Sequence, residues 1–171
     1  IKIGTGDVKK DGIRIVGSHI DNPRLDLKQV PLYEDNGVAF AKTHYYGGIR
    51  KYQWAAIPLA LHGVVAKKNG EVVTVKIGEE ESNPVFYVSD LLPHLAAKQN
   101  AKTLGEAIEG ENLNIWLGNI PYGEKDDDKT VKKNLLKILE EKYGIEEEDF
   151  LSAELSLTPS FKPKDIGFDR A

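Results

Sequence analysis

The feature that most limits the fold of this chain is a hairpin signal around Asn69 and Gly70. Two apolar runs rich in β-branched residues, "IPLALHGVVAKK" and "EVVTVKIG", flank this dipeptide. Asn-Gly favours a two-residue type I′ turn because both turn positions need a positive φ. The pattern therefore predicts two antiparallel strands joined by a tight turn.

Several other stretches have the pattern of strands. Residues 1–20 contain two apolar runs around a polar turn at 9–12, and the second run, 13–19, is nearly continuously apolar in its middle. Such a run is typical of a strand that is covered on both faces. Residues 22–30 alternate leucines with larger polar side chains, the period of a half-exposed strand. Further strands are expected within residues 38–48, 113–122 and 150–159, with a turn at 34–37.

Two helices complete the prediction. Residues 126–144 have aspartates at the N-terminal end and Gly144 at the C-terminal end, the expected chemistry of helix termini. The apolar face of this helix would be formed by Val131, Leu135, Ile138 and Leu139. A short helix is expected to start at Ser89 or Asp90, with Pro93 in its first turn. Together these elements predict an α+β or α/β chain that is rich in strands.

The composition narrows the class of protein. A chain of 171 residues is long enough for one domain with a sizeable core. The formal charge of −4 gives no reason to expect a nucleic-acid partner, and no run approaches the roughly 20 apolar residues of a membrane span. Cysteine is absent, which excludes disulfides and thiolate nucleophiles and fits a cytoplasmic location. The chain begins with Ile1 rather than methionine, so we expect a processed chain or a piece of a longer one.

The stretch "IRIVGSHIDNPRLDLK" places His19 and Asp21 two positions apart at the end of a predicted strand. Residues two apart in a strand point to the same side. An imidazole with a neighbouring carboxylate can bind zinc or cobalt, the carboxylate fixing the ring. The same pair can act as base and orienting group for a nucleophile. A surface histidine beside a turn aspartate is the third interpretation.

Three ordered motifs add a resemblance. "GSHIDNPRLDLK", "THYYGGIRKYQW" and "DLLPHLA" resemble the M18 family of metalloaminopeptidases, the aspartyl aminopeptidase family, and most closely its bacterial branch. The similarity continues into "YGIEEEDFLSAELSLTPSFKP" and so covers essentially the whole chain. It implies a metallopeptidase α/β catalytic domain that is interrupted by a β-rich inserted dimerisation domain. On this basis residues 1–23 belong to the catalytic domain, 24–162 to the insertion, and 163–171 return to the catalytic domain.

The resemblance also implies roles for individual residues. His19 would bind one of two catalytic divalent metals, usually zinc, with cobalt or manganese as alternatives, and Asp21 would orient it. Asn22 stands where many family members have serine. His94 would bind a metal or line a substrate pocket across a subunit contact, although its place near a helix start also suits a capping or buried structural histidine. Lys98 occupies the position of a second histidine in eukaryotic members.

The remaining ligands of such a site are not expected in this chain. The family supplies an Asp, a Glu-Glu pair, a further Asp and a late His from positions beyond the one that matches Ala171. The acidic runs at 79–81, 140–141 and 146–149 are interpreted as solvated surface. The resemblance therefore implies a zinc-dependent aminopeptidase that hydrolyses N-terminal residues from peptides, with only part of the active site here. The isolated chain is expected to be inactive.

The implied assembly is a homo-oligomer, a dodecamer built from dimers, and the implied partner is a peptide substrate. Two other interpretations stay open. The chain can be a non-catalytic oligomerisation and interaction module. It can also be an unrelated β-rich binding domain whose His-x-Asp motif is accidental.

Overall fold

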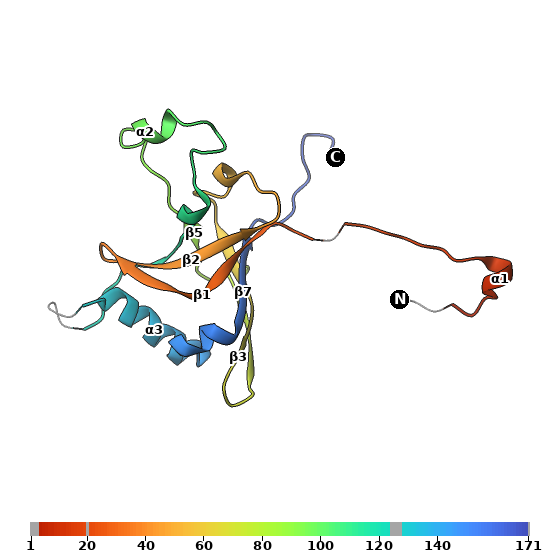
Figure 1. Ribbon diagram of the computed structural model, residues 1–171, viewed down its shortest axis with the longest axis horizontal. Coiled ribbons are helices and arrows are strands. Elements are labelled where there is room, and N and C mark those ends of the chain that lie inside the picture. The colour runs from red at the N-terminus through yellow and green to blue at the C-terminus, as the bar shows by residue number, and fades with distance from the viewer. Residues whose placement is uncertain (1–3, 20, 124–127, 171) are drawn as a thin grey trace.

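The computed structural model describes residues 4–19, 21–123 and 128–170. In this part of the chain, seven strands form one curled sheet in the order β4-β3-β7-β1-β2-β6-β5, with every neighbouring pair antiparallel (Figure 1). The strands are β1 (Arg24–Asp35), β2 (Val38–Tyr46), β3 (Leu59–Ala66), β4 (Val72–Ile77), β5 (Tyr87–Val88), β6 (Ile115–Gly118) and β7 (Ala153–Pro159). The helices are α1 (Val8–Asp11), α2 (Ala97–Asn100) and α3 (Thr130–Tyr143), with 3-10 turns η1 (Lys51–Gln53), η2 (Gly110–Asn112) and η3 (Glu147–Ser152). The fold is α+β.

Two hairpins of the sheet turn at an Asn-Gly dipeptide, but with different geometry. Between β1 and β2, Asn36 and Gly37 have φ values of 49° and 73°, the two positive values that a type I′ turn needs. Between β3 and β4, Gly70 has a φ of 86°, but the φ of Asn69 is not positive. The Gly70 N–H donates to the Lys67 carbonyl at 3.0 Å. This is the three-residue loop with a glycine bulge. The predicted hairpin at 69–70 is confirmed, and its predicted turn type is wrong.

The core lies at the centre of the sheet, where β7 is placed between β1 and β3. Leu157 pairs with Leu25 on one side and with Leu61 on the other. Leu25 and Leu157 are 0% and 1% exposed. Full burial of a leucine side chain contributes about 1.5–3 kcal/mol, so this row is a main source of stability. The strands predicted within 22–30 and 150–159 are therefore confirmed.

Helix α3 covers one side of this core, next to β1 and β2 (Figure 1). Val131 is buried, and Leu135, Leu136 and Leu139 pack against the core. The predicted face is wrong at Ile138, which is 38% exposed. The helix ends as predicted, because Gly144 has a φ of 61° and its N–H donates to the Glu140 carbonyl.

The N-terminal end of α3 differs from the prediction. Asp126 and Asp127, expected there, lie outside the described residues, and the helix starts at Thr130. A carboxylate from β1 acts at this end of the helix: Glu34 Oε2 accepts a hydrogen bond from the Lys132 N–H at 2.8 Å. An anion at this position satisfies a free N–H and suits the helix dipole. None of the described helices has the length and hydropathy of a membrane span.

The segment before β1 is an arm that extends away from the sheet (Figure 1). The strand predicted at 13–19 is wrong, since this stretch has no strand conformation and Ile15 and Val16 are 87% and 95% exposed. The polar turn predicted at 9–12 is occupied by the short helix α1. The first strand of the prediction falls partly on residues 1–3, outside the described ranges. An apolar run stays a strand only where neighbours accept its backbone hydrogen bonds.

The predicted helix start at Ser89 or Asp90 is also wrong. Residues 89–92 are non-helical, Pro93 begins a turn, and α2 covers only the four residues from 97 to 100. Asp90 Oδ1 accepts hydrogen bonds from the Leu91 N–H at 2.8 Å and from Gln99 Nε2 at 2.9 Å. Asp90 therefore ties the loop to α2 instead of capping a helix of its own.

Candidate functional site

The predicted His-x-Asp pair lies where the arm enters the sheet. His19 and Asp21 are both exposed, and residue 20 between them is outside the described ranges. Within the described ranges, no hydrogen bond or ion pair joins the two side chains. Strand geometry would make both face one side, but residues 13–19 do not form a strand. Their shared orientation remains a prediction.

Asp21 is in contact with the end of β2. The Tyr46 hydroxyl donates a hydrogen bond to Asp21 Oδ2 at 3.5 Å. Tyr46 is opposite Arg24 in the β1–β2 register, and the Arg24 guanidinium carbon lies 4.0 Å from the centre of the tyrosine ring. Arg24 Nε in turn donates to Asp26 Oδ1 at 2.7 Å. Asp21 is thus linked to the sheet through Tyr46, Arg24 and Asp26, each in contact with the next.

Sequence reasoning assigned no role to Tyr46, although this residue lies in the second motif. A signal was present, because a tyrosine pair followed by Gly47 and Gly48 marks a strand end at a close backbone approach. What the sequence did not contain was the β1–β2 register that places Tyr46 beside Asp21.

A cavity of about 660 Å³ opens at the same corner of the sheet. Its walls come from Asn22 and Pro23, from the loop at 48–50, from η1 and from the end of β7. Trp54, which closes one side, is 8% exposed and packs in the core. The cavity adjoins the segment that carries Asp21, because the two residues that follow Asp21 form part of its wall.

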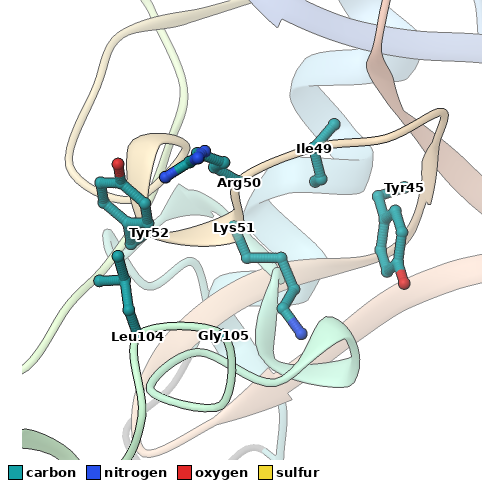
Figure 2. Close-up of a pocket in the computed structure, with 7 residues that line it drawn as sticks. All are labelled: Tyr45, Ile49, Arg50, Lys51, Tyr52, Leu104 and Gly105. Carbon is teal, nitrogen blue, oxygen red and sulfur yellow. The ribbon is translucent and has the colours of Figure 1, made fainter.

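A second, smaller cavity of about 320 Å³ lies beyond the end of β2. Figure 2 shows its lining, with Tyr52 and Leu104 on one side and Ile49 and Tyr45 on the other. Arg50 and Lys51 add two positive charges. The described residues that line it include neither a histidine nor a carboxylate, so this cavity offers no ligand set for a metal cation.

The structure does not join His94 to the His19 region through any hydrogen bond or ion pair among the described residues. His94 is exposed in the turn before α2, on the long loop between β5 and β6. Within this chain His94 is therefore not buried. Its metal or pocket role remains a prediction.

The donor set suits part of a zinc site. Imidazole nitrogen and carboxylate oxygen are ligand types that zinc takes, and a catalytic site needs three protein ligands. In the described ranges, no group of three or more His, Asp and Glu side chains is close enough together to hold a metal. His19 therefore suits one ligand position of a larger set, with Asp21 as its orienting carboxylate, and the described residues do not complete that set.

The acidic runs behave as surface. Glu79 forms an ion pair with Lys76 at 2.7 Å, and its other carboxylate oxygen lies 3.2 Å from His62 Nε2. The hydrogen bond from Lys76 lowers the pKa of Glu79, and the charge of His62 acts in the same direction. Glu147 and Glu148 form ion pairs with lysines elsewhere in the chain. These carboxylates are therefore paired with nearby cations, as expected for a solvated surface.

Comparison with known proteins identifies relatives for the whole chain. Residues 1–171 match the family profile described as "Aminopeptidase I zinc metalloprotease (M18)". The "Probable M18 family aminopeptidase 1" of Clostridium acetobutylicum is 56% identical over 160 residues, which cover 94% of this chain and 34% of that protein. The protein of the same name from Thermotoga maritima is 49% identical over 165 residues, which cover 96% and 36%.

Solved structures agree with the fold. The crystal structure of the M18 aminopeptidase from Thermotoga maritima superposes with a TM-score of 0.82 at 48% identity, over 89% of this chain and 33% of that one. Aminopeptidase I from Borrelia burgdorferi gives 0.74 at 44% identity, over 90% and 33%. The chain thus spans about a third of the length of the curated relatives that it matches.

Proposed function

This chain belongs to the M18 family of aminopeptidases, and we therefore propose that the intact protein is a zinc-dependent metalloaminopeptidase that removes N-terminal residues from peptides. The observation that carries the proposal is the family match along all 171 residues, with about half of the positions identical to the bacterial relatives. The peptide substrate follows from this family activity.

In the proposed site His19 is a metal ligand through one imidazole nitrogen, and Asp21 accepts a hydrogen bond from the other. A carboxylate in this position fixes the tautomer and raises the basicity of the ring. Bound zinc would polarise the scissile carbonyl and acidify a water molecule. His19 and Asp21 are exposed beside the edge of the sheet, where groups from outside the described residues can complete the ligand set.

The domain assignment is part of the same proposal. Residues 24–162 would be the inserted β-rich domain, while 1–23 and 163–171 would belong to the catalytic domain. These boundaries are supported by a difference in burial. The sheet is packed, whereas the segments that precede and follow it in the sequence are exposed. The catalytic domain itself would be α/β, built with segments that the described strands do not include.

The proposed assembly is a homo-oligomer built from dimers, a dodecamer in the implied form. The loop around His94 supports a contact surface, since Leu91, Leu92 and Leu95 are 55%, 59% and 64% exposed. Such a cluster of exposed leucines is typical of an interface. In this assembly His94 would bind a metal, or it would line a substrate pocket that it reaches across a subunit contact. A cytoplasmic location remains a prediction from the cysteine-free composition.

The second candidate is a non-catalytic oligomerisation module. It is favoured by one observation, the exposed Leu91, Leu92 and Leu95 of the loop around His94, which suit a contact surface. The two candidates differ in the intact protein and agree for the isolated chain, which is expected to be inactive in both.

The test is His19→Ala in the intact protein. Loss of one zinc ligand should reduce both bound zinc and peptidase turnover by at least about 100-fold. Zinc content by atomic spectroscopy and hydrolysis of aminoacyl substrates measure the two effects, and the wild-type 171-residue chain is the inactive control. Unchanged zinc and turnover would remove His19 from the site, and an intact wild-type protein without peptidase activity would favour the module.

A further inference from the structure

We propose that Tyr46 is a positioning residue for Asp21, whose carboxylate it holds through its phenolic hydroxyl. This inference rests on the proposed function, in which Asp21 orients His19 toward zinc. The Tyr46 hydroxyl donates to Asp21 Oδ2 at 3.5 Å. Within the described ranges it is the one side-chain donor that reaches this carboxylate.

The ring of Tyr46 is held in place from the neighbouring strand. Arg24 lies opposite Tyr46 in the register of β1 and β2, with its guanidinium carbon 4.0 Å from the ring centre. The guanidinium is itself fixed, because Arg24 Nε donates to Asp26 Oδ1 at 2.7 Å. A cation over an aromatic face attracts it electrostatically, so the hydroxyl at the far end of the ring has a defined direction.

The backbone at this corner limits how far Asp21 can move from Tyr46. Gly47, directly after Tyr46, has a φ of 82°, and a Cβ built on it would lie 3.7 Å from the Pro23 Cα. The chain that enters β1 therefore runs close beside the chain that leaves β2, with room at Gly47 for little more than a Cβ. Asp21 is two residues before Pro23, whose ring restricts its own φ and the conformation of Asn22.

The chemistry of the contact suits a positioning role. A carboxylate has two oxygens, so a donor on Oδ2 leaves Oδ1 free for the imidazole N–H of His19. Removal of a residue that hydrogen-bonds to a metal ligand, without binding the metal itself, commonly lowers metal affinity by 10- to 100-fold. At 3.5 Å the bond is long, as hydrogen bonds of a site often are before the site is fully assembled.

The experiment is Tyr46→Phe in the intact protein, with Tyr45→Phe as the matched control. Both changes remove only a hydroxyl, and Tyr45 and Tyr46 are similarly exposed at 36% and 42%. The Tyr45 ring stacks on His44, and among the described residues its hydroxyl has no hydrogen-bond partner. We expect Tyr46→Phe to weaken zinc binding about tenfold in chelator competition. Tyr45→Phe should stay within about twofold of wild type.

A second measurement separates positioning from simple structural support. Asp21→Asn should weaken zinc binding, and adding Tyr46→Phe to it should cause no further loss, since the hydroxyl acts through Asp21. For Tyr46→Phe alone, kcat should fall with KM unchanged, and the melting temperature should match that of Tyr45→Phe.

The inference is overturned if Tyr46→Phe retains zinc like wild type, or if its loss multiplies with that of Asp21→Asn. Its failure is distinguishable from failure of the proposed function. If only the inference about Tyr46 fails, His19→Ala still reduces zinc binding and turnover. If the proposed function fails, His19→Ala leaves zinc binding and turnover unchanged.

Discussion

The arm at 4–23 and the sheet at 24–159 contain similar apolar residues in opposite environments. Ile15 and Val16 are 87% and 95% exposed, whereas Leu25, a few positions later, is 0% exposed. Both stretches have the composition of strands, but only the second has neighbours that accept its backbone hydrogen bonds. An apolar run therefore specifies the capacity to form a strand, while pairing decides whether a strand forms.

Glycines should give the strongest contrast between the two regions. In β3, Gly63 has a φ of 141°, and a Cβ there would lie 1.9 Å from the Glu154 carbonyl oxygen. Gly63→Ala should therefore force β3 and β7 apart and cost about 4 kcal/mol or more of unfolding free energy. The matched change in the arm is Gly17→Ala, where a Cβ has no atom within 4 Å. Its effect should stay within about 0.5 kcal/mol, as measured by urea denaturation of the chain.

Equal denaturation midpoints for the two alanine variants would contradict this prediction. Such a result would mean that β3 and β7 are not paired across Gly63 as the register requires.

A smaller contrast comes from matched apolar truncations. Leu157→Ala removes a side chain that is 1% exposed between two strands, so it should cost about 2–5 kcal/mol. Ile15→Ala removes a side chain that is already in water and should change stability by less than about 0.5 kcal/mol. Both are measured by thermal and urea unfolding of the 171-residue chain.

The arm can behave differently in the intact protein. If residues 1–23 belong to a catalytic domain there, Ile15→Ala should become destabilising by about 1 kcal/mol or more, because the arm then has neighbours. An unchanged Ile15→Ala variant in both contexts would contradict the domain assignment.

The smallest effect concerns the surface of the sheet. The pKa of Glu79 is lowered by its hydrogen bond with Lys76, so the ionised carboxylate is favoured in the folded chain. The contribution of this pair is therefore present above the ordinary value of 4.5 and is lost as the pH falls through the lowered value. Glu79→Gln should lower the melting temperature slightly at pH 7 and in low salt.

The difference between Glu79→Gln and wild type should disappear in acid below this range, and it should shrink at high ionic strength. The control is Asp11→Asn in the arm, since among the described residues the Asp11 side chain accepts a hydrogen bond from the Asp7 backbone alone, four positions away. A Glu79→Gln effect that grows in acid would contradict the sign of the shift.

Local patterns predicted most of the sheet. The hairpin at 69–70, the alternation at 22–30, the strand ended by Pro159 and the helix ended by Gly144 are all present. Each of these signals acts within a few residues, through turn geometry or the period of one element. The failures at 13–19 and near Ser89 have another cause. Residues 13–19 pair with no strand among the described residues, and Asp90 bonds to Gln99 of α2 instead of capping a helix of its own.

Some features of the candidate site likewise follow from the sequence, and others from the folded chain alone. Residue type and order alone establish the presence of His19 and Asp21, the membership of a family and the lack of cysteine chemistry. The contact of Tyr46 with Asp21 and the capping of α3 by Glu34 emerge only in the folded chain. Both contacts follow from strand register and helix docking, and these are set by the packing of the whole core.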